Sequence, residues 1–299
     1  MTRVVVLLAA VLAAAAAVQG SQATFTASAT NSGTSFVTAS KFPPTVTLTT
    51  PANGSATNDT TPLFTGTADN ATGDSSTVTA KVYSGTSATG SPVQTKSGTR
   101  SGTSFSFSLT TALAQGTYTA VVTQTDTSGN TGTSNANTFT VDTTKPTASQ
   151  VTAANKAGGT AGKIEAGDTL TFAYSEAIAP NSVWSGWNGS ATTVHIRFTS
   201  AGNDTITVLT VANGTGINLG SVATNGDYVT ATATFNATMA MSSDGTSVVL
   251  TLGTPSNVSS SASPGRNMTW TVGAGITDLA GNTITTPATY NQTNSDVDF

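Results

Sequence analysis

Short segments in which apolar and polar residues strictly alternate recur along most of this chain. In STVTAKVYSG (residues 76–85), Val78, Ala80 and Val82 fall on one face. A period of two is the pattern of a β-strand with one buried and one exposed face. The same pattern recurs in residues 45–50, 62–68, 92–95, 104–110, 116–126 and 136–142, and again in 166–178, 193–199, 204–211, 227–235, 246–252 and 268–273. No amphipathic pattern of helix length follows the apolar N-terminus. The alternation therefore predicts an all-β protein.

Turn signals and one proline-bearing linker divide the chain. Turns follow one another about every 8–12 residues, which is typical of an antiparallel β-sandwich. Asn-Gly pairs at Asn188, Asn213 and Asn225, and Asp244-Gly245, predict hairpin turns. The polar stretch DTTKPT (residues 142–147) predicts a domain boundary. We expect two tandem antiparallel β-sandwiches, at residues 44–144 and 145–299, after an extended arm at 24–43.

The chain is poor in charge and has no cysteine. Charged residues make up 8% of the 299 residues and the formal net charge is −4, whereas soluble proteins average roughly 25% charged residues. Nucleic acid binding needs a basic stripe, and the scattered Lys and Arg residues do not form one. The lack of cysteine excludes disulfides, thiolate metal sites and cysteine nucleophiles.

The N-terminus resembles an export signal. Arg3 precedes a run of Val, Leu and Ala that spans residues 4–18, and this run is shorter than the roughly 20 residues of a membrane span. Small residues then allow cleavage after Gly20 or after Ala23. We expect residues 1–23 to be removed, with a retained anchor as the alternative. The product would be secreted or associated with the cell envelope, with no membrane span after cleavage.

The pattern Asp-x-x-Gly-Asn-Thr-x-Thr occurs twice, at Asp126–Thr133 and at Asp278–Thr285. Each copy precedes the last expected strand of its domain. Asp side chains cap turns by accepting backbone N–H bonds, and Gly and Asn tolerate a positive φ. One interpretation is therefore a single turn used at the same corner of two domains. The other is a weak calcium site built from Asp126, Asp142 and backbone carbonyls near the domain junction.

The stretch WSGWNG places two tryptophans beside an Asn-Gly turn. Exposed rings of Trp184 and Trp187, with Asn188, would form a platform that stacks on sugar rings, because aromatic side chains offer a large contact area. The alternative is that one ring fills the core and the other covers a loop. Trp270, in the strand-like MTWTV, is expected in the core or on a sheet face.

No catalytic constellation stands out. His195 is the one histidine, and it should point away from Val194 and Ile196 on its strand. No Gly-x-Ser-x-Gly motif occurs. Paired carboxylates for glycoside hydrolysis could come only from Glu165, Asp168 and Glu176, and solvated turn residues are the alternative for all three. We therefore predict no catalytic residue and no cofactor, with calcium as the one possible ion.

The sequence also resembles a known family. Residues 44–146 resemble a bacterial Ig-like domain of tandem surface proteins, in TVTLTTPANGSATNDTTPLFTGTA, in QGTYTAVVTQTDTSGNTGTSNANTFTVD and in the linker DTTKP. Residues 145–294 resemble the Ig-like type associated with S-layers, in AGDTLTFAYSEAI and ITDLAGNTI. GSQATFTASATNSGTSF is similar to the mature start of camelysin-like biofilm-fibre proteins, which favours cleavage after Ala23.

The resemblance implies that the two tandem antiparallel β-sandwiches are immunoglobulin-like. It also implies a non-catalytic structural or adhesive role outside the cell. The partner would be an envelope or extracellular protein, or a polysaccharide. The arm at residues 24–30 offers a further mode, self-association, by adding as a strand to an open edge of a neighbouring copy. The alternatives are a carbohydrate-binding module that uses Trp184 and Trp187, and a hydrolase that uses Glu165, Asp168 or Glu176.

Overall fold

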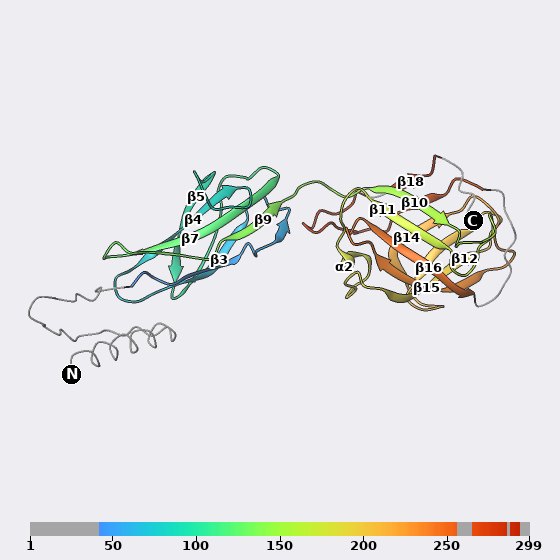
Figure 1. The fold of residues 1–299 in the computed structure, drawn as a ribbon, viewed down its shortest axis with the longest axis horizontal. Coiled ribbons are helices and arrows are strands. Elements are labelled where there is room, and N and C mark those ends of the chain that lie inside the picture. The colour runs from blue at the N-terminus through green and yellow to red at the C-terminus, as the bar shows by residue number, and fades with distance from the viewer. Residues whose placement is uncertain (1–41, 256–264, 286–287, 294–299) are drawn as a thin grey trace, which may run out of the picture.

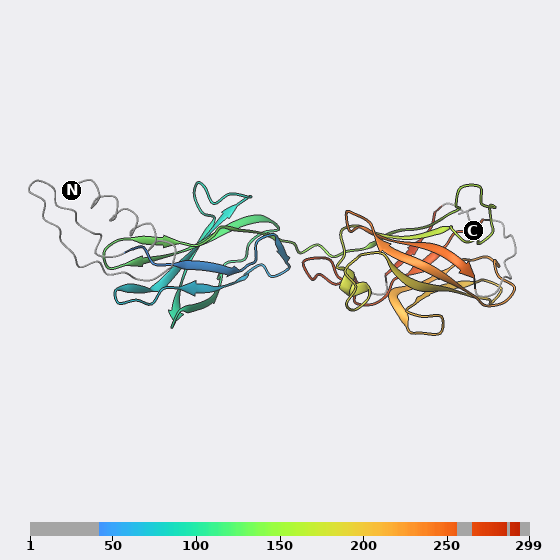
Figure 2. The ribbon, with the colours of Figure 1, turned by 60° about the horizontal axis from the view of Figure 1, so that its bottom comes forward.

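The computed structural model describes residues 42–255, 265–285 and 288–293. The expected signal peptide, its cleavage site and almost all of the expected arm lie outside these residues. Two β-rich bodies follow each other end to end along the long axis (Figures 1 and 2). Within the described ranges the one α-helix is the short α2 (Pro180–Val183), and none is long and apolar enough to cross a membrane. The prediction of an all-β protein is confirmed.

The first domain is a sandwich of two β-layers. Its strands are β1 (Val46–Thr50), β2 (Ser55–Thr57), β3 (Leu63–Ala68), β4 (Asp74–Ser84), β5 (Gln94–Ser101), β6 (Ser104–Ser108), β7 (Gly116–Asp126), β8 (Thr131–Thr133) and β9 (Asn137–Val141). The hydrogen-bonded order is β1-β3-β6-β5-β4-β7-β9-β2, with β8 beside β7. Strand β5 joins the layers, because its first part pairs with β4 and its last two residues pair with β6.

Two details identify this sandwich as immunoglobulin-like. The first strand is split between the layers: β1 pairs antiparallel with β3, and β2 pairs in parallel with β9. The hydroxyl of Tyr118, near the start of β7, donates to the carbonyl of Ala114 at 2.9 Å. This bond back to the preceding corner is the tyrosine corner of immunoglobulin-like domains.

Alternating residues fill the core of the first domain as predicted. Val78, Ala80 and Val82 of β4 are fully buried. Aromatic rings contribute to this core. Phe64 of β3 stacks on Phe107 of the neighbouring strand β6 with centroids 6.1 Å apart, and it meets Phe139 of β9, in the other layer, edge-on at 6.5 Å. Such pairs stabilise by about 0.5–1.5 kcal/mol beyond the area that they bury.

The second domain is a longer antiparallel sandwich. Its strands are β10 (Ala148–Ala154), β11 (Thr169–Tyr174), β12 (Thr192–Thr199), β13 (Thr205–Leu209), β14 (Gly216–Ala223), β15 (Ala233–Met241), β16 (Ser247–Pro255), β17 (Thr269–Thr271) and β18 (Thr289–Asn291). The hydrogen-bonded order is β10-β11-β16-β15-β12-β13-β14-β17-β18. The side chain of Gln292 links the two ends of this order, since it donates to the carbonyl of Val151 at 3.1 Å. Trp270 is fully buried, which confirms its expected place in the core.

Two of the four predicted hairpin turns are correct. Asn213-Gly214 connects β13 to β14, and Asp244-Gly245 connects β15 to β16. Asn225-Gly226 does not form a hairpin, because β14 and β15 are not neighbours in the sheet. Asn188-Gly189 lies between α2 and β12 and does not form a hairpin either.

The strand predicted at residues 227–235 begins later, at Ala233 of β15. Part of the preceding backbone is held by a side chain. The buried carboxylate of Asp204 accepts the N–H groups of Tyr228 and Val229 at 2.6 and 2.8 Å. A side chain that satisfies buried backbone donors removes the need for a strand partner there.

Replacement of Tyr118 by Phe should destabilise the first domain. The variant keeps the buried ring and loses only the bond to Ala114, so we expect the free energy of unfolding to fall by about 1 kcal/mol. Chemical denaturation of the full chain measures this change. Tyr83→Phe is the control, since the Tyr83 hydroxyl has no partner among the described residues. Equal stability of Tyr118→Phe and wild type would contradict the tyrosine-corner assignment.

Candidate functional site

The two Asp-x-x-Gly-Asn segments form the same turn. In the first, the carboxylate of Asp126 accepts the backbone N–H of Asn130 at 2.9 Å and its side-chain amide at 2.8 Å. In the second, the carboxylate of Asp278 accepts the same two groups of Asn282 at 2.8 and 2.7 Å. The glycine of each turn has a positive φ, 86° at Gly129 and 92° at Gly281. The interpretation of a repeated turn is thereby confirmed.

The second of these turns lies against the first domain. The side-chain amide of Asn282 donates to the carbonyl of Asp142 at 2.8 Å. The N–H of Asn58, in the first domain, donates to the carbonyl of Ala280 at 3.1 Å. The turn therefore binds the end of the first domain through both side-chain and backbone groups.

The prediction that Asp126 and Asp142 bind one calcium ion together is wrong, because the two residues lie far apart. Val141 lies opposite Gly116 at the start of β7, so Asp142 is near that end, whereas Asp126 is the last residue of β7. Eleven residues of strand separate the two ends, which at about 3.3 Å per residue is roughly 30 Å. One carboxylate oxygen of Asp142 also has a local hydrogen-bond partner, since Oδ1 accepts the N–H of Thr144 at 2.9 Å.

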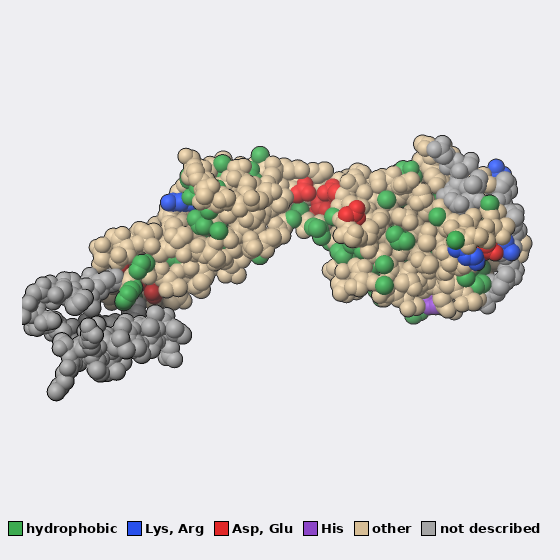
Figure 3. Space-filling view, viewed as in Figure 1, with side chains coloured by type: hydrophobic (Ala, Val, Ile, Leu, Met, Phe, Trp, Pro, Cys, Tyr) green, Lys and Arg blue, Asp and Glu red, His purple; other side chains and the backbone are tan. Residues whose placement is uncertain are grey.

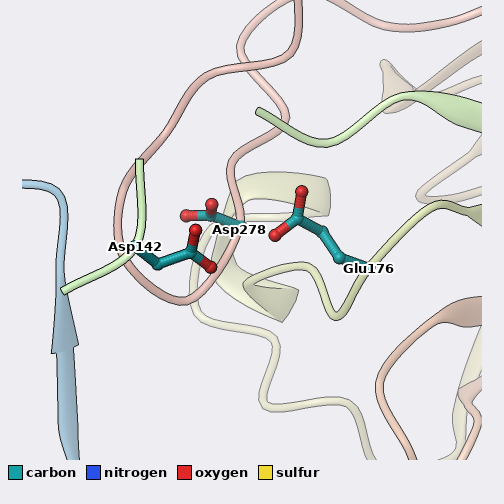
Figure 4. A group of neighbouring side chains, drawn as sticks. All are labelled: Asp142, Glu176 and Asp278. Atoms are coloured by element: carbon teal, nitrogen blue, oxygen red, sulfur yellow. The ribbon is translucent and has the colours of Figure 1, made fainter. Parts of the chain in front are cut away.

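Asp142 instead joins two other carboxylates. Oxygen atoms of Asp142, Glu176 and Asp278 lie within 4.8 Å of one another, in a group that we call the junction triad. The three side chains come from separate segments and face one another (Figure 4). Asp142 follows β9, Glu176 follows β11, and an isolated bridge to Ile178 places Asp278 beside that segment. Acidic side chains gather where the two bodies meet (Figure 3).

The electrostatic environment of the junction triad disfavours a third negative charge. Burial raises the pKa of Glu176 above its ordinary value of 4.5, and the carboxylates of Asp142 and Asp278 raise it further. Asp278 is buried, with 2% of its surface exposed. The sequence singled out its turn but did not place Asp278 beside Asp142 and Glu176, because that arrangement depends on the docking of the two domains.

The other two candidate carboxylates have structural partners far from Glu176. Asp168 is fully buried and accepts the N–H groups of Lys156 and Glu165 at 3.0 and 2.6 Å. The carboxylate of Glu165 accepts the N–H of Thr160 at 2.9 Å, and this bond lowers the pKa of Glu165. Because β11 separates Asp168 from Glu176, the two lie roughly 20 Å apart. The three carboxylates considered for glycoside hydrolysis, Glu165, Asp168 and Glu176, therefore do not meet in one site.

His195 lies on β12, opposite to its neighbours as predicted. Val194 and Ile196 are fully buried, whereas His195 is half-buried. Its Nδ1 has no hydrogen-bond partner among the described residues. It lies outside the junction triad, whose three members are all carboxylates.

The two tryptophans of WSGWNG do not form a two-ring exposed platform. Trp187 is buried, with 7% of its surface exposed, and its indole N–H donates to the carbonyl of Ser190 at 2.7 Å. Trp184 is half-buried and packs against the core, while Asn188 is exposed. A hollow of about 340 Å³ lies beside these residues. One ring in the core and one over a loop was the alternative, and the structure supports it.

Comparison with known proteins identifies the first domain. Residues 47–143 match the sequence model of a bacterial Ig-like domain family, which confirms the resemblance found in this part of the chain. Such domains typically occur in extracellular or surface proteins. No curated protein matches the chain.

Two solved structures show weak similarity. The fibronectin(III)-like modules of Clostridium thermocellum CbhA are 14% identical, with 70% of this chain and 90% of that chain covered and a TM-score of 0.29. The FN1-FN3 domains of chicken CNTN1 are 12% identical, with 73% and 66% covered and a TM-score of 0.27. At such scores the fold assignment rests on the strand pairing described above.

Replacement of Trp187 by Ala should cost far more stability than replacement of Trp184. Loss of a buried Trp ring leaves a cavity and costs about 3–5 kcal/mol, whereas the half-buried Trp184 removes less core contact. Denaturant unfolding of the two variants, followed by circular dichroism, measures the difference. If both variants lost the same small free energy of unfolding, the result would contradict the burial of Trp187 and indicate that both rings are exposed.

Proposed function

We propose that this protein is a secreted, non-catalytic structural or adhesive protein at a bacterial cell surface. The family match of residues 47–143 supports this setting, because such domains typically occur in extracellular or surface proteins. The apolar run at residues 4–18, with its small-residue cleavage sites, supports export. The partner would be a protein or polysaccharide of the envelope or its surroundings.

The observation that carries the proposal is the end-to-end docking of two sandwiches. Hydrogen bonds from Asn282 to Asp142 and from Asn58 to Ala280 cross between the domains. Loops at the far ends of the two bodies are thereby held apart (Figure 1). A spacer that presents loops at a distance suits an adhesive or structural surface protein.

The non-catalytic part of the proposal is supported by the places of the candidate carboxylates. Asp168 and Glu165 bind backbone groups of their own loop. Glu176 has a raised pKa, as a general acid would, but its carboxylate neighbours are the junction residues Asp142 and Asp278. Ig-like domain families are also generally non-catalytic.

Carbohydrate binding is a second candidate function. The hollow of about 340 Å³ beside Trp184 favours it, because a ring on the wall of a hollow can stack on a sugar. With Trp187 in the core, this site would depend mainly on Trp184 and the exposed Asn188. The weaker aromatic surface makes it the less favoured of the two candidates.

A binding assay on intact envelopes and purified polysaccharides separates the candidates. We expect the chain from Thr24 to bind envelope preparations, to bind them equally when Trp184 is replaced by Ala, and to release no sugar from any glycan. Binding to a purified polysaccharide that Trp184→Ala abolishes would favour the carbohydrate module. Turnover of any glycan, lost in Glu176→Gln, would overturn the non-catalytic assignment.

The addition of the arm as a strand to a neighbouring copy needs a separate test. A chain that lacks residues 23–40 should lose self-association, measured by analytical ultracentrifugation, and keep its fold. Among the described strands β1 lies at one end of the pairing order, but the side chains of Asn135 and Asn137 already bond the backbone of Leu48 on this strand. An added strand would have to pair elsewhere along this edge or displace them. Unchanged self-association after the truncation would eliminate the arm as the donor.

A further inference from the structure

We propose that this protein is N-glycosylated on exposed asparagines in loops of both domains. The acceptor signal is Asn-x-Ser/Thr, with any residue but proline at x, and we call each occurrence a sequon. The modifying enzyme would be an oligosaccharyltransferase, and the donor a lipid-linked oligosaccharide diphosphate. The proposal rests on the export part of the proposed function, because this modification belongs to secreted proteins.

The first observation is that all nine sequon asparagines of the described ranges are exposed. A chain rich in Ser and Thr forms some sequons by chance, so their number alone decides nothing. Their placement does, because only three of the eight described asparagines outside sequons are exposed: Asn135, Asn181 and Asn225. The exposed sequon asparagines are Asn53, Asn58, Asn70, Asn188, Asn203, Asn213, Asn236, Asn267 and Asn291.

The second observation is that the fold does not use the side-chain amides of these nine asparagines. None of them donates a hydrogen bond from Nδ2 to a described residue; where the side chain bonds at all, Oδ1 accepts, as in Asn53 and Asn213. Asparagines outside sequons behave differently. Nδ2 of Asn137 and Nδ2 of Asn218 each donate to two backbone carbonyls, and Nδ2 of Asn282 holds the domain junction.

A free Nδ2 is what the transfer chemistry requires, because this atom is the nucleophile. It forms a bond with C1 of the first sugar while the bond from C1 to the diphosphate breaks. The lipid diphosphate leaves with the bonding electrons, and one proton of the amide passes to a base of the transferase. An Nδ2 that holds the fold together would have to give up its hydrogen bonds first, whereas the sequon asparagines are ready to react.

Asn70, Asn188 and Asn203 are the lead acceptors, because each lies in a loop. Asn70 lies between β3 and β4, Asn188 between α2 and β12, and Asn203 between β12 and β13. The side chain of Asn188 makes only a local bond, in which Oδ1 accepts the N–H of Ser190 at 3.1 Å. A loop can enter the active site of an enzyme without breaking a strand pair, whereas Asn236 is part of β15.

A glycan on Asn188 would also have an aromatic neighbour. Asn188 and Trp184 line the same hollow of about 340 Å³, and Trp184 is half-buried. The first sugar on Asn188 would lie at this hollow, where the ring can stack on it. The partly exposed ring would then serve the chain's own glycan instead of a separate polysaccharide.

Glycosylation fits the low charge of the chain. Charged residues make up 8% of the sequence, whereas soluble proteins average roughly 25%. N-linked glycans are bulky and solubilising. With lead acceptors in both domains, glycans would supply hydration that the side chains of this protein provide only sparsely.

Mass spectrometry of proteolytic peptides tests the proposal on the full chain, purified from the cells that make it. We expect peptides with Asn70, Asn188 and Asn203 to be heavier by whole sugar residues, and peptides with Asn137 and Asn282 to be unmodified. An exported chain whose three lead peptides all have unmodified masses would overturn the glycosylation and leave export standing. A chain that stays in the cytoplasm with residues 1–23 attached would overturn export, and the glycosylation with it.

Matched controls separate the sequon from simple exposure. Ser190→Ala keeps Asn188 and removes only an exposed hydroxyl, so the glycan on Asn188 should be lost completely, whereas Ser190→Thr should retain it. Asn181 is an internal control, because it is exposed and donates no bond from Nδ2 to a described residue, but Val183 stands where a sequon needs Ser or Thr. A glycan on Asn181, or one on Asn188 that persists in Ser190→Ala, would overturn the assignment.

Discussion

The junction of this protein depends on the side-chain amide of Asn282. One of its two N–H groups donates to Asp278 within its own turn, and the nitrogen also donates to the carbonyl of Asp142 in the other domain. An amide NH₂ has two donors, so both are used. The bond that shapes the turn and the bond that docks the domains therefore share one group, and the turn places Asp278 beside Asp142.

This arrangement gives a physical reason for the Asp-x-x-Gly-Asn repeat. The turn is needed by each sandwich for local reasons, since the carboxylate satisfies backbone and amide donors at a sharp bend. In the second domain the same turn also meets the preceding domain and places the Asp278 carboxylate at the junction. The Asp126 turn of the first domain shares the geometry, but Asp142 lies at the other end of β7.

The alternation of apolar and polar residues predicted the strands of the two sandwiches well, but the sequence predicted the candidate binding sites poorly. Alternation found β7 with its correct ends and the buried face of Val78, Ala80 and Val82. It missed β14, where Gly216 and the positive-φ Gly220 interrupt the apolar pattern. Burial of Trp187 and the meeting of Glu176 with Asp278 arise from tertiary contacts, which a spacing along the chain does not encode.

The central claim is that the two domains are docked end to end through the Asn282 turn. Because the chain has no cysteine, spin labels at Thr99→Cys and Thr238→Cys, both exposed positions, report the inter-domain distance by pulsed electron paramagnetic resonance without background labelling. The account predicts one narrow distance distribution in the wild-type chain that broadens in Asn282→Ala, because this variant loses the bond to the carbonyl of Asp142. A broad distribution in the wild-type chain, or one that is equally narrow in Asn282→Ala, would contradict it.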